Sequence, residues 1–291
     1  MKVANVAGRL ALVVGEGAAE RAVDVGRASD GRLPSDPGEA YGHWDELRAW
    51  AAEASAAGAR RLDELAEPLD PRRLGEPSPS PRQVFAIGLN YRDHAAEAGQ
   101  DVPTVPQVFT KFPTCLAGPY ADVVLPSDRV DWEVELVVVI GRRAEDVAEA
   151  DAWSYVAGLT LGQDISERRV QFATKPPQFS MGKSYPTFGP IGPVLVTADE
   201  FADPDDLELG CRVGDEEVQR ARTSLMIFTI PQLLAYLSGI CPLLPGDLIF
   251  TGTPAGVGST RNPRRYLQPG EVIESFAENI GTMRNRCVSG P

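Results

Sequence analysis

Asp131-Trp132-Glu133-Val134-Glu135-Leu136-Val137-Val138-Val139-Ile140-Gly141 is the stretch around which we interpret this chain of 291 residues. Its apolar, β-branched run from Glu135 to Ile140 predicts a buried strand. Side chains alternate between the faces of a strand, so Glu133 and Glu135 should point to the same side where this strand begins. Two buried carboxylates need a shared proton, a basic partner or a divalent cation. On a half-exposed strand end, both would simply face water.

Composition and charge limit the class of protein. The formal net charge is -13, and clustered Lys and Arg are absent, so we expect no nucleic-acid partner. No apolar run approaches the roughly 18 residues of a membrane span, and the N-terminus lacks the pattern of a signal peptide. We therefore expect a cytoplasmic protein that has no membrane partner.

Histidine and cysteine limit the chemistry. His43 and His94 are the only histidines, which excludes a metal site built from several imidazoles and leaves oxygen ligands for any ion. The four cysteines are far apart and suggest neither a zinc site nor a disulfide framework: Cys115, Cys211, Cys241 and Cys287.

The chain divides at a proline-rich segment. Residues 1–78 predict a small α+β domain, with strands at 10–14 and 22–25 and a helix at 44–57, and residues 67–81 serve as the linker. We expect this part to be non-catalytic, and we expect His43 to lack an acidic partner at helical spacing. Residues 79–291 predict a larger, mostly β domain.

Asp164 follows a predicted strand at 155–162, a usual place for a site residue on a rigid scaffold. The Gly- and Pro-rich residues 182–193 predict an ordered loop. Further elements are strands at 84–88, 109–112, 194–196, 207–213, 217–219, 248–253, 272–276 and 281–288, and a helix at 229–238.

His94 and Glu97 are separated by three residues. On a helix they would be neighbours, so that the carboxylate could orient the imidazole and raise its basicity. Many such pairs merely lie on helix surfaces, and this spacing alone leaves both interpretations open. The loop 252–258 resembles a phosphate-binding loop only superficially, because the following Gly-Lys-Ser/Thr is missing.

Together these residues resemble the fumarylacetoacetate hydrolase family between about Val84 and Val288. The resemblance rests on motifs in the family's order: Asn90, Tyr91, His94 and Glu97; Glu133-Val134-Glu135; Asp164-Ile165-Ser166-Glu167-Arg168-Arg169-Val170-Gln171; Gly182-Lys183-Ser184-Tyr185; and Thr251 to Gly258. It departs at Gln163, Glu167, Arg169 and Pro186, which we take to affect the choice of substrate.

The resemblance implies a fold and a metal. The fold is α+β but mostly β, a mixed β-sandwich roll with a small N-terminal domain, usually a homodimer. The metal is Mg²⁺ on Glu133, Glu135 and Asp164. Three carboxylates make a hard-oxygen site that also suits Mn²⁺ or Ca²⁺ and disfavours zinc.

The activity that the resemblance implies is Mg²⁺-dependent hydrolysis of a C–C bond in a 1,3-diketo acid such as an acylpyruvate. His94, held by Glu97, would activate water, and the metal and Lys183 would stabilise the developing enolate. The substrate contacts would be Arg168, Gln171, Thr253 and Lys111. Lys183 could equally be an ion-pair partner of the metal carboxylates.

Two alternatives stay open. The same metal site could decarboxylate oxaloacetate-like acids, or isomerise or hydrate 2-hydroxy-dienoates. The protein could also be a binding protein without catalysis, although the retained His94, Glu97 and acidic ligands speak against that. Residues 90–99 are short and rich in Ala and Gly, so they should bury little apolar area and act as a lid whose order depends on substrate.

Overall fold

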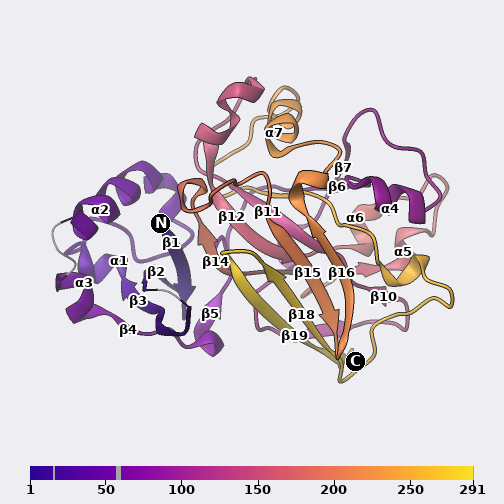
Figure 1. Cartoon of the computed structure of the whole chain (residues 1–291), viewed down its shortest axis with the longest axis horizontal. Coiled ribbons are helices and arrows are strands. Elements are labelled where there is room, and N and C mark those ends of the chain that lie inside the picture. The colour runs from indigo at the N-terminus through magenta and orange to yellow at the C-terminus, as the bar shows by residue number, and fades with distance from the viewer. Residues whose placement is uncertain (16, 57–59, 291) are drawn as a thin grey trace.

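The computed structural model describes residues 1–15, 17–56 and 60–290 and shows a mostly β protein with mixed sheets. The N-terminal residues, with helices α1 (Val25–Ala28), α2 (Trp44–Ala56) and α3 (Arg60–Leu65), lie at one end of the molecule (Figure 1). The short helices α4 (Arg92–Glu97), α5 (Arg168–Gln171) and α6 (Phe179–Gly182) lie at the opposite end. This separation places the predicted site far from the N-terminal helices.

One large sheet runs through the whole molecule in the order β4-β3-β2-β1-β14-β12-β11-β17-β6-β7. Its neighbours pair antiparallel except β17 with β6. The strands are β4 (Glu67–Pro68), β3 (Arg21–Asp24), β2 (Arg9–Val14), β1 (Lys2–Val6), β14 (Gly189–Val196), β12 (Val156–Gln163), β11 (Val134–Ile140), β17 (Leu248–Phe250), β6 (Val84–Gly88) and β7 (Gln107–Thr110), with β5 (Leu74–Gly75) on β1 and β8 (Leu116–Ala117) on β14.

The predicted strand after Glu133 is β11, a central strand buried along its whole length. Leu136, Val138 and Ile140 pack into one hydrophobic cluster, and Val137 and Val139 pack into another on the opposite face. Both faces are covered, which is why this strand is apolar throughout instead of alternating. The period of two that sorts these residues also places Glu133 and Glu135 on one side.

A second sheet, β16-β15-β18-β19-β9, packs its apolar face against the large sheet. Its strands are β16 (Glu216–Arg222), β15 (Glu208–Val213), β18 (Val272–Ala277), β19 (Gly281–Ser289) and β9 (Val123–Leu125). The core between the sheets contains Leu159, Leu161, Leu209, Ile273 and Met283. It also includes the buried face of α7 (Ile230–Ser238), which begins with a capping box formed by Thr229 and Gln232.

The N-terminal part shares its sheet with the rest of the chain. Strand β1, which lies outside the two predicted N-terminal strands, pairs with β14, so the sheet continues across the expected boundary near residue 78. The proline-rich segment has regular contacts with the rest of the chain: β4 pairs with β3, and β5 pairs with β1. The hydroxyl of Ser78 donates a 2.8 Å hydrogen bond to the carbonyl of Gly246. The predicted end of the helix at 44–57, Ala57, lies outside the described residues.

The predicted loop at 182–193 is wrong in its second half, because β14 already begins at Gly189. Proline cannot donate to a ladder, so we had excluded a strand there. Pro193 is tolerated because the register of β14 against β12 shifts between Leu159 and Leu161. The hydroxyl of Thr160 donates to the carbonyls of Gly192 and Val194 at this irregularity, at 3.2 and 2.8 Å.

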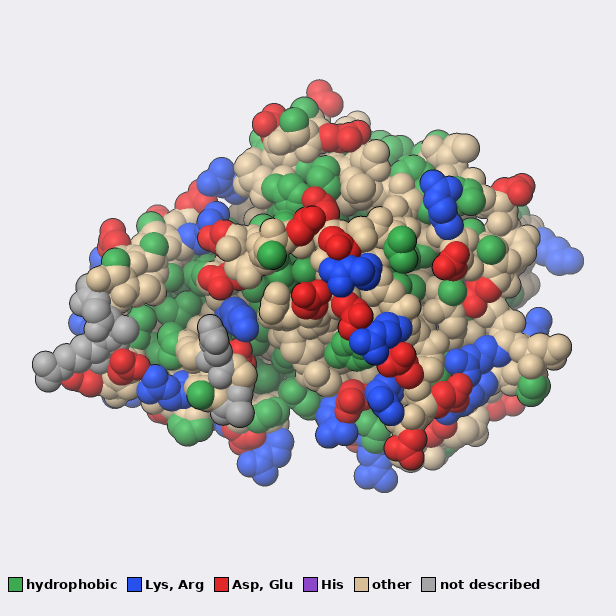
Figure 2. Space-filling model, viewed as in Figure 1, with side chains coloured by type: hydrophobic (Ala, Val, Ile, Leu, Met, Phe, Trp, Pro, Cys, Tyr) green, Lys and Arg blue, Asp and Glu red, His purple; other side chains and the backbone are tan. Residues whose placement is uncertain are grey.

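The remaining short elements connect these layers. The acidic segment before β12 is a 3-10 helix (Glu149–Tyr155) that packs on α7, and β10 (Val130–Asp131) pairs with β13 (Ser166–Glu167). Acidic and basic side chains intermingle on the face shown in Figure 2. On β15 and β16 and the segment before them, exposed ion pairs include Arg220–Glu208 and Arg222–Asp206. None of the described helices has the length and hydropathy needed to cross a membrane.

Candidate metal and substrate site

Three buried carboxylates meet where β11 begins and β12 ends. Glu133, Glu135 and Asp164 each offer an oxygen atom, and these atoms lie within 4.8 Å of one another. The antiparallel register of β11 on β12 pairs Val134 with Gln163, and the backbone N–H of Asp164 donates to the carbonyl of Glu133 at 2.8 Å. Two neighbouring strands therefore hold the three side chains on a rigid base.

Two buried lysines neutralise part of this negative charge. The ammonium of Lys183 lies 2.6 Å from Glu133 Oε2 and 2.5 Å from Asp164 Oδ2. Lys111 Nζ lies 2.7 Å from Asp164 Oδ1 and also donates to the carbonyls of Lys183 and Phe188. Burial acts to lower the pKa of Lys111, but the charge and hydrogen bond of Asp164 together with other nearby negative groups outweigh it and raise this pKa.

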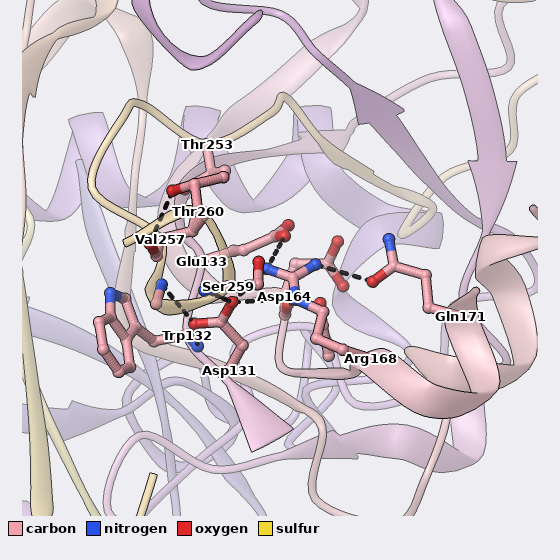
Figure 3. A network of polar contacts seen from close by, with 12 residues as sticks. Asp131, Trp132, Glu133, Asp164, Arg168, Gln171, Thr253, Val257, Ser259 and Thr260 are labelled. Carbon is pink, nitrogen blue, oxygen red and sulfur yellow. Dashed lines mark hydrogen bonds and ion pairs between the residues drawn. The ribbon is translucent and has the colours of Figure 1, made fainter. Parts of the chain in front are cut away.

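Arg168 ties the carboxylates to a neighbouring loop. Figure 3 shows its guanidinium between Asp131, Glu133 and Gln171. Its Nη2 lies 2.7 Å from Asp131 Oδ2 and 2.7 Å from Glu133 Oε1, and its Nη1 donates to Gln171 Oε1 at 2.8 Å. Asp131 in turn accepts the backbone N–H groups of Gly258 and Ser259 at 2.7 and 2.8 Å. Such a multidentate arginine fixes both position and orientation.

The two glutamates of the strand have opposite electrostatic environments. Burial acts to raise the pKa of Glu133, but the Lys183 and Arg168 cations lower it to about 2. Burial raises the pKa of Glu135 well above its usual value, and the negative charges of Asp164 and Glu133 add to this effect. The ionised form of Glu135 is therefore disfavoured among these residues, and a divalent cation beside it would stabilise that form.

The chemistry of these donors fits a divalent ion that prefers oxygen. Glu133, Glu135 and Asp164 are the residues that would hold it, because all three are buried, acidic and close together. Among the described residues, the Glu135 side chain has no ion-pair partner, and its Oε2 accepts a 2.8 Å hydrogen bond from the backbone N–H of Gly252. A buried carboxyl group without a counter-charge, next to two other acids, is the observation that best fits a cation site.

The predicted dyad forms on α4. Nδ1 of His94 lies 2.7 Å from Glu97 Oε1, and both side chains are largely buried. Glu97 Oε2 accepts from the backbone N–H of Gly256 and from the hydroxyl of Thr260, both at 3.0 Å. Burial acts to raise the pKa of Glu97, but hydrogen bonds from His94 and Gly256 outweigh it and lower this pKa. An ionised Glu97 fixes the imidazole so that Nε2 is the basic nitrogen.

The segment that carries the dyad is more firmly packed than its sequence predicts. We expected it to bury little apolar area, but Tyr91 and Ala95 are fully buried. The side chain of Asn90 closes its base: Nδ2 donates to the carbonyls of Phe228 and Thr251 at 3.0 and 2.7 Å, and Oδ1 accepts from the N–H of Phe228. The expected weakness of residues 90–99 was therefore overstated, because the aromatic and the asparagine anchor them.

A cavity of about 430 Å³ connects the dyad with the carboxylates. This volume is within the range of small-molecule sites. Among its lining residues are five predicted site residues besides the carboxylate Glu133: His94, Arg168, Gln171, Lys183 and Thr253. The structure therefore brings most of the predicted catalytic and substrate residues around one space.

Some predicted residues lie elsewhere. Lys111 does not line the cavity, and its ammonium is fully enclosed by Asp164 and two carbonyls, so we replace the expected substrate contact by a supporting role. Glu135 and Asp164 are fully buried and do not line the cavity either. His43 does have an acidic neighbour at helical spacing, Glu46 Oε2 at 3.4 Å, contrary to our expectation.

The departures from the family motifs do not reach the cavity either. Gln163 is buried, accepts from the backbone N–H of Glu133 at 3.0 Å and donates to Ser275 at 2.8 Å. Glu167 caps α5 by accepting from the N–H of Val170, and Arg169 pairs with Asp128 on the surface. Pro186 is exposed, and none of these four residues lines the cavity, so their influence on the choice of substrate stays a prediction.

Several site residues are not predicted from the sequence. Asp131 precedes Glu133 by two positions, and that spacing was the available signal for a third acid on the same side. Gln219 Nε2 donates to Thr253 Oγ1 at 2.8 Å, but it lies on another sheet and carries no motif. The aromatic lining was also missed because its members are distant in sequence: Phe109, Phe172 and Phe179.

Comparison with known proteins gives the family. The model of the fumarylacetoacetate (FAA) hydrolase C-terminal family matches residues 83–288. The chain belongs to this family. It is 41% identical to the human mitochondrial oxaloacetate tautomerase FAHD2A over 241 residues, which cover 81% of this chain and 77% of the relative. It is 44% identical to the 2,4-didehydro-3-deoxy-L-rhamnonate hydrolase of Sphingomonas sp. (strain SKA58), covering 79% and 82%.

Solved structures share the fold. The maleylpyruvate hydrolase from Sphingobium sp. SYK-6, in complex with manganese (II) ion and pyruvate, superposes with a TM-score of 0.79 at 27% identity and full coverage of both chains. Family members thus include enzymes that act on small keto acids, and the predicted family, fold class and acidic cluster are confirmed at this level.

Proposed function

We propose that this protein is a divalent-metal-dependent hydrolase that cleaves a C–C bond in a small 1,3-diketo acid of the acylpyruvate kind. The observation that carries the proposal is that His94, oriented by Glu97, lines the same cavity as Glu133, Arg168 and Lys183. A general base and a cluster of groups suited to bind and stabilise an oxo acid thus face one space.

Glu133, Glu135 and Asp164 would hold the ion, which we expect to be Mg²⁺, with Mn²⁺ or Ca²⁺ as further candidates. When bound, such an ion supplies a Lewis acid next to the oxo acid. The manganese and pyruvate of the Sphingobium hydrolase complex support this choice of ion class and of substrate end.

The chain's own groups account for the remaining chemistry. Arg168, Gln171 and Thr253 orient the carboxylate and keto oxygens of the substrate. His94 takes a proton from water, whose oxygen forms a bond to the distal carbonyl carbon. Breaking the adjacent C–C bond then releases a carboxylic acid and the enolate of pyruvate, and the proton returns to the enolate carbon. Lys183 has one N–H left after Glu133 and Asp164, and it stabilises the enolate oxygen.

A second candidate is tautomerisation of oxaloacetate, and the identity with the human tautomerase favours it. This reaction moves a proton between carbon and oxygen through the same enolate and needs no attack by water. Decarboxylation of oxaloacetate and isomerisation or hydration of a 2-hydroxy-dienoate belong to the same group. A silent binding protein is the least supported, since the dyad and all three acidic residues are assembled.

The test is a panel of acylpyruvates, oxaloacetate and 2-hydroxy-dienoates, assayed with Mg²⁺ and with EDTA, with products identified by NMR. Release of pyruvate and a carboxylic acid from an acylpyruvate supports hydrolysis. Keto–enol exchange of oxaloacetate without cleavage of any acylpyruvate replaces the proposal with the tautomerase. Turnover that EDTA leaves unchanged contradicts both.

A further inference from the structure

The cavity is divided into two chemically different ends. Its inner end contains Glu133, Arg168 and Lys183, where the oxo acid end of a substrate belongs under the proposed function. Its outer end is formed by apolar side chains and neutral amides from β6 and α4 and the residues that follow them, from β7, and from the segment between the end of α5 and the start of α6: Ile87, Leu89, Ala98, Gln100, Gln107, Phe109, Phe172, Pro177 and Phe179.

Aromatic rings dominate the outer end. Phe179 contacts Phe109 edge to face with ring centroids 5.5 Å apart, and it contacts Phe172 in the same manner at 6.2 Å. Lys183 Nζ lies 5.2 Å from the centre of the Phe109 ring, so this ring stands at the border between the two ends. Phe172 remains 53% exposed despite this contact, so much of its apolar surface is open at this end of the cavity.

The outer end has no cation for a second carboxylate. Among the described residues that line the cavity, the basic side chains are His94, Arg168 and Lys183. Arg168 and Lys183 belong to the inner end, where they pair with Asp131, Glu133 and Asp164, and His94 pairs with Glu97. Lys175, next to this region in sequence, is exposed and does not line it. A carboxylate placed there would lose water without gaining a counter-charge.

We propose that the group on the distal side of the substrate is neutral and apolar, such as an aryl or alkyl chain, and is not a second carboxylate. The inference rests on the proposed function for the direction in which the oxo acid lies. It narrows the substrate class from diketo acids in general to aroyl- or alkanoylpyruvates with one carboxylate.

The decisive probes are stable mimics that are read by binding alone. N-Phenyl oxamate keeps the oxo acid end and places a ring where the acyl group would lie, and N-(4-carboxyphenyl) oxamate adds only the second carboxylate. We expect calorimetry with Mg²⁺-loaded protein to show at least about tenfold tighter binding of the phenyl compound. Equal affinity, or tighter binding of the carboxylated compound, would overturn the inference.

Substitutions can show which residues cause the preference for the phenyl compound. Phe179→Ala should weaken the phenyl oxamate about tenfold and leave oxalate unchanged, because oxalate occupies only the inner end. Phe112→Ala is the matched control, since Phe112 is also an exposed aromatic but does not line the cavity. If Phe112→Ala weakens binding of the phenyl compound as much as Phe179→Ala does, the phenyl group does not bind at the aromatic outer end.

A gain of function completes the test. A Cβ atom placed on Gly88 would lie 3.6 Å from both Gln107 Oε1 and Phe179 Cε2, so Gln107 and the ring border the same spot. Gln107→Arg should therefore restore binding of the carboxylated compound to within about threefold of the phenyl compound. Turnover separates the two proposals: if binding shows the preference but no acylpyruvate is cleaved, the hydrolase proposal fails and the apolar outer end stands.

Discussion

Two His-x-x-Glu pairs in this chain have identical spacing and different surroundings. His43 and Glu46 lie at the start of α2, about half or more of each side chain is exposed, and their closest atoms are 3.4 Å apart. His94 and Glu97 are 2.7 Å apart, with 11% and 22% of their side chains exposed, and Glu97 is bound by Gly256 and Thr260. The spacing creates a pair, but the neighbouring loop and the cavity give only one of them a chemical use.

The largest expected effect on turnover comes from the three carboxylates of the proposed metal site, which lie near the His94–Glu97 pair. Glu135→Gln should reduce turnover to the limit of detection while both His-x-x-Glu pairs stay in place, because the proposed ion loses a ligand. Assays with and without added Mg²⁺, together with calorimetric titration of the metal, check this result. Full activity of the variant after exhaustive chelation would contradict the metal site.

The same variant has an opposite expected effect on stability. The pKa of Glu135 is raised in the folded protein, so its protonated form favours folding at low pH, and this contribution is lost as the pH rises through the raised pKa. Metal-free native protein should therefore lose stability as the pH rises through this range. In Glu135→Gln that loss should be absent, and Tm in EDTA at pH 8 should be a few degrees higher than that of the native protein.

Replacing the histidines tests the comparison directly. His94→Ala should lower kcat by about 10²–10⁴, the usual range for a lost general base, whereas binding of oxalate should change little. Decarboxylation of oxaloacetate needs no activated water and should survive better than hydrolysis. His43→Ala is the matched control and should retain native kcat. An equal loss in both variants at equal stability would show that the two pairs are not functionally different.

Replacing the glutamates of the two pairs should have a smaller effect, which hydrogen exchange can measure. Glu97→Gln removes the charge that accepts from Gly256 and Thr260, and hydrogen bonds to charged groups contribute about 1.5–3 kcal/mol. Hydrogen exchange of residues 91–98 should become at least about tenfold faster, and Glu46→Gln should leave exchange in α2 nearly unchanged. Thr260→Val, which removes a single donor, should give an intermediate rate. Unchanged exchange in Glu97→Gln would mean that Asn90 and Tyr91 alone hold this segment.

The smallest expected effect is on the pH dependence of hydrogen exchange in residues 91–98. The pKa of Glu97 lies below its ordinary 4.5 in the folded protein, so its ionised form stabilises the docked segment above pH 4.5, and this contribution is lost as the pH falls through the lowered pKa. Protection of residues 91–98 should therefore weaken on acidification before the core unfolds. In Glu97→Gln this pH dependence should be absent, and exchange over pH 3–6 measures the difference.

The sequence by itself determined the family, the central strand and the three acids. The alternation of side chains along a strand and the closeness of residues three apart on a helix depend only on local geometry. The side shared by Glu133 and Glu135 and the pairing of His94 with Glu97 could therefore be predicted from their spacing. The proline and glycine content of 182–193 predicts a loop throughout, but β14 contains Pro193 where its register with β12 shifts, and a register depends on the pairing of two strands.

Only the tertiary structure decided which of these residues meet. Lys111 and Lys183 reach Asp164 from 53 and 19 positions away, and nothing in the local pattern of either lysine separates a substrate contact from an ion pair. Phe109, Phe172 and Phe179 form the outer end through sheet pairing and the folding of α5 onto α6. Long-range contacts between distant segments set both burial and counter-charge, so the lysines' roles and the polarity of the cavity follow from the assembled fold.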